Sequence, residues 1–140
     1  MYHEIKIKFF PDIDNIGYIF QMPSLTLYID KEIAASRLNP ERVKCLSSDL
    51  QIAVQKHLNP APDTFQINLV VCEACGPSYP ISMTLHFRAS KQRDKNTLMV
   101  CLEEAAKTIE SHLKSSARLR AFAVGEDRIF ALNHQSSFQS

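Results

Sequence analysis

The sequence contains no tryptophan, only 3 glycines and 4 cysteines in 140 residues, and almost no net charge, because 16 Lys and Arg oppose 15 Asp and Glu. Nonspecific nucleic-acid binding depends on clustered Lys and Arg that neutralise phosphates, so the balanced charge argues against a nucleic-acid partner. The glycines form neither a P-loop nor a G-x-G-x-x-G motif, so no nucleotide is implied. No apolar run approaches the roughly 20 residues that span a bilayer, and we therefore expect no membrane partner.

The few cysteines do not form a recognisable metal or redox site. Cys72 and Cys75 make a C-x-x-C, but no second Cys pair or His pair follows at the spacing of zinc ligands. A redox C-x-x-C usually sits where a strand meets a helix, whereas here residues 76–80 have a turn sequence. We interpret these thiols as structural or incidental and expect neither a metal nor a cofactor.

Hydrophobic residues, by contrast, make up 45% of the chain. A chain of this length forms one domain and buries roughly two-thirds of its extended surface, so its core needs no disulfide or metal. The first residues do not resemble a signal peptide, because Glu4 stands where a basic region belongs and residues 11–14 interrupt any apolar segment. We therefore expect a cytoplasmic, single-domain protein.

The pattern from Pro23 onward predicts a strand, a helix and a strand. Residues 25–29 alternate between apolar and polar side chains, which is the period of a half-buried strand. Asn39 and Pro40 then read as a helix N-cap and first helical position, and apolar residues recur at spacings of three and four up to Leu58. Residues 65–71 are again strand-like.

The second half of the chain repeats this plan. The strand-like residues 83–87 lie 58 positions after residues 25–29, the second helical stripe ends at Leu113, 55 positions after Leu58, and residues 118–124 form the fourth strand. The predicted fold class is α+β, with two fused β-α-β repeats forming a four-stranded mixed sheet and two helices on one face. Apolar residues around Val70 and Phe122 predict that partner subunits bury the other face, a solvated face being the alternative.

Several of these features together resemble the tautomerase superfamily, and within it the 5-carboxymethyl-2-hydroxymuconate isomerase group. They are Met22-Pro23 ahead of a β-α-β unit, a second copy about 55 residues later, and a Met83-Thr84-Leu85 strand followed by a basic loop. The resemblance runs from Met22 to about Asn133 and is most specific over residues 81–89. It implies the tautomerase fold, a homotrimer, and a cofactor-free isomerase of aromatic compound catabolism with an amino-terminal proline as general base and acid.

The resemblance makes Pro23 the expected catalytic residue. A proline at a true N-terminus is a secondary amine, and burial beside apolar groups lowers its pKa toward the value that suits proton transfer. An internal proline nitrogen is an amide without useful basicity. We therefore expect residues 1–22 to be an N-terminal extension that is absent from the mature protein, residues 23–133 to be the tautomerase-like domain, and residues 134–140 to be a C-terminal tail. The alternative is a genuine extension with an extra strand over residues 5–10.

The resemblance also implies cations that bind the substrate carboxylate and stabilise the developing dienolate. The expected arginine falls on Lys91 when counted from the preceding strand and on Arg93 when counted back from the helix. We favour Arg93, because a planar guanidinium matches a carboxylate bidentately, and Lys91 stays an alternative. Arg88 and Lys31 are weaker candidates.

An arginine expected on the second strand is missing, and Gln66 or Asn68 stands in that neighbourhood. This departure puts the exact muconate substrate in doubt, although Lys31 and Arg37 could supply the charge, and Arg118 and Arg120 could reach the site of a neighbouring subunit. The predicted function is a keto–enol tautomerase or double-bond isomerase acting on a small carboxylated enol such as a 2-hydroxymuconate derivative. The alternative is a catalytically inactive tautomerase-like or ferredoxin-like oligomeric domain that binds a small molecule.

Overall fold

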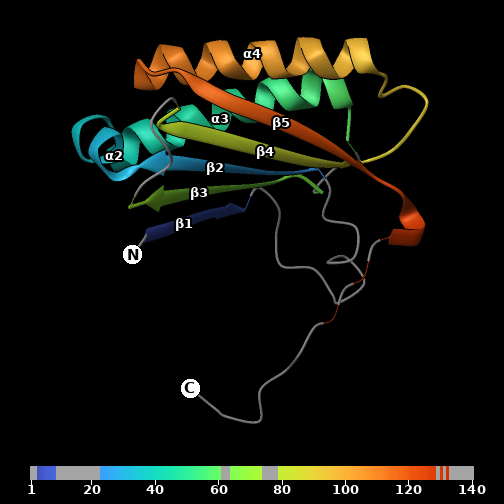
Figure 1. Cartoon of the computed structure of the whole chain (residues 1–140), viewed down its shortest axis with the longest axis horizontal. Coiled ribbons are helices and arrows are strands. Elements are labelled where there is room, and N and C mark those ends of the chain that lie inside the picture. Colours follow the sequence, from blue (N-terminus) through green and yellow to red (C-terminus); the bar gives the residue numbers. More distant parts are fainter. Residues whose placement is uncertain are drawn as a thin grey trace.

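The computed structural model describes residues 3–8, 23–60, 64–73, 79–128, 130 and 132. These residues form one five-stranded sheet with the strand order β1-β3-β2-β4-β5. Two long helices, α3 and α4, lie side by side over one face of the sheet, and none of the described helices lies over the other face (Figure 1).

The two sequence repeats build four of the five strands. In the first repeat, β2 (Ser24–Asp30) is followed by α3 (Pro40–Leu58) and by the parallel strand β3 (Gln66–Cys72). In the second, β4 (Ile81–Arg88) is followed by α4 (Lys95–Leu113) and by the parallel strand β5 (Ala117–Val124). The first strands of the two repeats, β2 and β4, pair antiparallel in the middle of the sheet. The predicted mixed sheet of two fused β-α-β repeats is therefore confirmed.

Three further elements are added to this plan. β1 (His3–Lys8) pairs antiparallel with β3 along six positions and becomes an edge strand of the sheet. The extra strand that we gave as the alternative for the N-terminal segment is thus present in the full chain. The short helix α2 (Lys31–Arg37) follows β2 directly and was not predicted, and a 3₁₀ turn, η1 (Glu126–Arg128), follows β5.

The two long helices begin and end in the same way. The side chain of Asn39 accepts a hydrogen bond from the backbone N–H of Arg42 at 2.7 Å, and Asp94 accepts one from Thr97 at 2.8 Å. Each helix ends at a residue with a left-handed backbone, namely Asn59 (φ 43°) and Lys114 (φ 52°). No helix in the described part of the chain is both long and apolar enough to cross a membrane.

Equivalent polar contacts also join α3 to α4. His57 Nε2 lies 3.0 Å from Glu104 Oε2, and His112 Nε2 lies 2.7 Å from Asp49 Oδ2. His57 and His112 are 55 positions apart, as are Asp49 and Glu104. Each helix therefore places a histidine of its last turn against a carboxylate in the middle of the other helix. The sequence repeat is thus reproduced as an approximate two-fold symmetry of the fold.

One hydrophobic core fills the space between the helices and the sheet. Alternate residues of β2 and β4 are buried, and the residues between them are only partly buried. The largest fully buried side chains come from both helices and from the three central strands β2, β3 and β4: Leu25, Leu27, Ile29, Leu46, Leu50, Ile67, Leu69, Ile81, Met83, Leu85, Ile109 and Leu113.

The face of the sheet opposite the helices is mainly polar along the central strands. Ser24 and Thr26 of β2 lie opposite His86 and Thr84 of β4 on this face, and all four are partly buried. The alternation in β2 and β4 directs every leucine and isoleucine toward the helices. The residues from which we predicted an apolar face, Val70 and Phe122, belong instead to β3 and β5. Phe122 is 43% exposed.

Candidate active site

Pro23 lies immediately before β2, at the end of the sheet where β2 and β3 begin and β4 and β5 end (Figure 1). It is buried, and its carbonyl accepts a hydrogen bond from the N–H of Gln66 at 3.1 Å. This bond places Phe65 on one side of it, and the register between β2 and β4 places Phe87 on the other, one position beyond the last pair. Because Phe65 and Phe87 are only 2% and 3% exposed, Pro23 has buried aromatic neighbours on both sides.

The buried aromatic side chains around Pro23 suit an amine that must be neutral near pH 7. Burial among apolar groups disfavours a charged ammonium, which is the effect that would make a terminal Pro23 a usable base. In the full chain, however, the nitrogen of Pro23 is joined to Met22 as an amide and has no proton to exchange.

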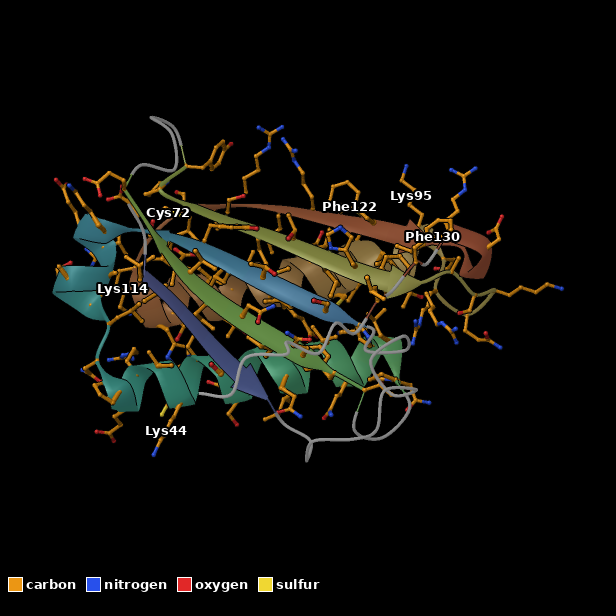
Figure 2. The ribbon with its side chains drawn as sticks, turned by 90° about the horizontal axis from the view of Figure 1, so that it is seen from below. Lys44, Cys72, Lys95, Lys114, Phe122 and Phe130 are labelled. Carbon is orange, nitrogen blue, oxygen red and sulfur yellow. The ribbon has the colours of Figure 1, made fainter. Side chains whose placement is uncertain are left out.

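Cations gather at the same end of the sheet. Arg88 is the last residue of β4, and the turn after it contains the exposed Lys91 and the partly buried Arg93. Burial, together with the nearby charge of Arg88, lowers the pKa of Arg93, so the two guanidinium groups lie close to one another. Lys95 begins α4 at this end, beside Phe122 (Figure 2). The structure thus brings Arg88, Lys91 and Arg93 to the Pro23 end of the sheet.

The guanidinium group of Arg93 is bound to the backbone. Its Nε and Nη2 donate to the carbonyl oxygen of Leu58 at 3.3 and 3.1 Å, and its Nη1 donates to the carbonyl oxygen of Arg88 at 2.9 Å. Leu58 is the last residue of α3, so Arg93 joins the C-terminus of a helix to the end of β4. These contacts were not foreseen from the sequence.

Lys31 lies at the opposite end of the sheet from Pro23, because it is the first residue after β2 has crossed the sheet. Its Nζ is 2.7 Å from Glu73 Oε1, and both side chains are more than half exposed. The hydrogen bond from Lys31 lowers the pKa of Glu73, and the same contact raises the pKa of Lys31. Arg37 also lies at this end. The structure therefore does not bring Lys31 or Arg37 to Pro23 within one chain.

The open face next to Pro23 carries a residue that the sequence analysis did not select. His86 stacks on Phe122, with ring centroids 5.0 Å apart and an interplanar angle of 17°. His86 could have been selected from the sequence, because it lies between the apolar residues Leu85 and Phe87 of an alternating strand. This alternation directs its side chain to the open face. On the same face, Gln66 donates to Asn68 at 3.1 Å. The two amides that stand near the expected second-strand arginine thus contact each other.

A groove of about 510 Å³ runs between the start of α4 and β5. Its walls combine apolar and cationic side chains, among them Phe87, Arg93, Lys95, Met99, Arg120 and Phe122. Arg93 and Phe87 belong both to this groove and to the surroundings of Pro23. Such a lining suits a ligand with an apolar or conjugated part and a negative charge.

The thiols are dispersed over the described part of the chain. Cys45 on α3 is exposed, Cys72 at the end of β3 is partly buried, and Cys101 on α4 is buried. Cys75, the second cysteine of the C-x-x-C, lies outside the described residues. In the ranges that the structure describes, no three His, Cys, Asp or Glu side chains are grouped as a metal site.

Comparison with known proteins gives matches by structure and none by sequence. No family model and no curated protein matches the chain. A wild-type fused 4-OT that forms a symmetric trimer is similar in structure, with a TM-score of 0.64, 13% identity, and coverage of 82% of this chain and 96% of that one. Pt0534 inactivated by 2-oxo-3-pentynoate is similar with a TM-score of 0.60 and 14% identity. The match covers 74% of this chain and 87% of Pt0534. MIF2 from Leishmania major is similar with a TM-score of 0.59 and 9% identity, and the match covers 74% of this chain and 89% of MIF2.

These identities are low, so the likeness concerns the fold. The trimer just described is a fused 4-OT, and the present chain matches nearly all of its length with two β-α-β units in one polypeptide. The chain therefore has the fold of the fused 4-OT proteins, which is the tautomerase fold that the family resemblance implied.

Proposed function

We propose that the protein is a cofactor-free keto–enol tautomerase or double-bond isomerase of the 5-carboxymethyl-2-hydroxymuconate isomerase type, acting on a small carboxylated enol such as a 2-hydroxymuconate derivative. The observation that carries this proposal is the placement of Pro23 between Phe65 and Phe87 at the cationic end of the sheet. The structural likeness to Pt0534 supports it, because that protein is inactivated by 2-oxo-3-pentynoate, a carboxylate with an adjacent keto group.

The chemistry requires only a proton carrier and positive charge. The amine of Pro23 takes the proton of the enol hydroxyl, and the electron pair of that O–H bond forms the carbonyl. The electrons of the former C=C bond then take a proton from the prolinium, which restores the neutral amine. Arg88, Lys91 and Arg93 together supply positive charge at this end of the sheet, which attracts the carboxylate and stabilises the dienolate.

This mechanism needs a free nitrogen on Pro23, so we propose that the working protein begins at this residue. Residues 1–22 are then absent from the mature chain, and residues 23–133 form the catalytic domain, followed by the tail of residues 134–140. Loss of β1 would leave β3 as an uncovered edge strand. β3 closes the first repeat as β5 closes the second, and β5 is already an edge strand. Uncovered strand edges favour association with other chains.

We also propose a homotrimer, in line with the trimeric fused 4-OT that this chain resembles in structure. Within one chain, Lys31 and Pro23 lie at opposite ends of β2. Lys31 would therefore take part in catalysis only by reaching Pro23 of a neighbouring subunit. The second-strand arginine that is missing here would in that case be replaced by a cation from another chain.

The proposal is tested by expressing residues 22–140 and the full 140 residues in parallel and by measuring intact masses. Both proteins are assayed for ketonisation of 2-hydroxymuconate and of phenylenolpyruvate. We expect activity only in the short form after loss of its methionine, and no activity in Pro23→Ala. Pro40→Ala, at an exposed helix start, is the matched control and should stay active. Activity that survives Pro23→Ala would refute the proline mechanism.

A second candidate is a catalytically inactive domain that binds small carboxylates. The pairing of β1 with β3 along six positions favours it, because a retained N-terminal segment keeps Pro23 as an amide. Sequencing the N-terminus of the natively expressed protein separates the two candidates. A species that retains Met1 would leave binding without turnover as the function.

A further inference from the structure

Two arginines occupy equivalent places in the two halves of the fold. Arg93 donates to the carbonyl oxygen of Leu58, the last residue of α3. Arg37 donates through Nη1 to the carbonyl oxygens of Leu113, the last residue of α4, and of Lys114, the latter at 2.6 Å. Each arginine comes from the repeat that does not contain the helix it binds. The C-terminal carbonyl groups of both helices are thus capped by a cation from the other repeat.

The equivalent contacts of Arg37 indicate that the contacts of Arg93 with the end of α3 have a structural role. Arg37 makes the same kind of contact at the end of the sheet that lacks Pro23, so capping does not depend on a catalytic site. Arg93 additionally reaches the carbonyl oxygen of Arg88. It therefore ties the end of α3, which leads to Phe65, to the end of β4, which carries Phe87. Those are the two aromatic neighbours of Pro23.

The bonding capacity of Arg93 is largely committed to the backbone. A guanidinium has five N–H donors, and Nε, Nη1 and Nη2 of Arg93 all contact backbone carbonyls. The side-on edge formed by Nε and Nη2, which is suited to a bidentate carboxylate, is directed at Leu58. Capturing a substrate carboxylate there would require breaking the cap of α3.

We infer that Arg93 is a positioning residue, which clamps the end of α3 to the end of β4 and so fixes Phe65 and Phe87 around Pro23, while Arg88 and Lys91 take the substrate carboxylate. The clamp is a property of the full chain. Its consequence for the reaction rests on the proposed function.

Hydrogen exchange on the full chain tests the clamp, because each arginine has a reporter amide at the helix end it caps. The N–H of Asn59 donates to Gln55 at 3.0 Å, and that of Lys114 donates to Glu110 at 2.8 Å. In Arg93→Gln we expect exchange at Asn59 to be at least tenfold faster and exchange at Lys114 unchanged. Arg37→Gln is the matched control, with the opposite pattern expected. Unchanged exchange at Asn59 in Arg93→Gln would overturn the clamp.

Kinetic measurements on the active form of the chain test whether Arg93 positions the site while Arg88 and Lys91 bind the carboxylate. Arg93→Lys keeps the charge but loses the planar fork whose Nε and Nη2 contact Leu58 while Nη1 contacts Arg88. We therefore expect kcat to fall at least tenfold with KM within about threefold. Arg88→Lys should instead raise KM. A raised KM with an unchanged kcat in Arg93→Lys would make Arg93 a carboxylate ligand and overturn the inference. If neither form of the chain is active, the proposed function fails, and the exchange experiment still decides the clamp.

Discussion

The approximate two-fold symmetry makes a quantitative prediction for the core. Leu27 in the middle of β2 and Leu85 in β4 are 58 positions apart, and both have 0% exposure. Leu27 lies opposite Met83 across the pair of central strands, and Leu85 lies opposite Leu25. We therefore expect Leu27→Ala and Leu85→Ala to leave two cavities between the sheet and the helices that are lined by similar residues.

The expected loss is a sizeable fraction of the stability of the protein. Truncating a fully buried leucine to alanine lowers the free energy of unfolding by roughly 3–5 kcal/mol, from lost transfer energy and the cavity left behind. A chain of 140 residues has a stability of about 7–21 kcal/mol at 0.05–0.15 kcal/mol per residue. With an unfolding entropy of about 2.1 cal/mol/K per residue, the loss corresponds to a fall in Tm of about 10–17 °C.

Chemical and thermal unfolding followed by circular dichroism, at one fixed protein concentration, measures both losses. Val100→Ala on α4 is the control, because Val100 is 45% exposed and its truncation should change stability by less than about 0.5 kcal/mol. A loss below about 1 kcal/mol in either leucine variant, or a difference above about 2 kcal/mol between the two, would refute the symmetric packing on which the prediction depends.

Three further predictions concern single side chains. Asn39→Ala removes the N-cap bond to Arg42 and should lower the free energy of unfolding by about 1 kcal/mol, measured from denaturant midpoints; an unchanged midpoint would show that the cap contributes nothing. Burial raises the pKa of Cys101 from the usual 9.0 to about 11, so at pH 8 its thiolate fraction falls about 100-fold. Iodoacetamide should therefore label exposed Cys45 far faster than Cys101 by mass spectrometry, and equal rates would contradict the burial. Hydrogen bonds from His57 and Lys56 lower the pKa of Glu104, so its contribution to stability is present above the usual pKa of 4.5 and is lost as the pH falls through the lowered folded value. Stability should thus fall less steeply below pH 4.5 in Glu104→Gln than in the wild type, and identical pH profiles would count against the ion pair.

Local patterns were sufficient to predict the repeat. The alternation in residues 25–29 and 83–87 and the cap at Asn39 depend on neighbours within a few positions, and the strands and helices lie where these patterns put them. The short helix α2 was missed, because seven residues contain too little periodicity to separate a helix from a loop. The polar character of the open face could have been read from the same alternation, since its residues are the serines and threonines between the leucines.

Distances across the site were harder to predict than the elements that form it. Lys31 is only 8 positions from Pro23, but an extended strand advances about 3.3 Å per residue, and β2 carries Lys31 to the far end of the sheet. Arg93 is 70 positions from Pro23 and nevertheless lies at the same end. A short separation in the sequence therefore does not place Lys31 beside Pro23 within one chain, whereas the order of the strands brings Arg93 to the same end of the sheet.

The sequence by itself determined the type and order of the four repeat strands and the two long helices, because burial alternates with the period of a strand or a helix whatever lies far away in the chain. Only the tertiary structure decided which groups meet. The carbonyl oxygen of Leu58 and the guanidinium of Arg93 are 35 positions apart, and their contact exists because two helices pack antiparallel over one sheet. Which backbone group a cation reaches depends on that packing, and no local pattern encodes it.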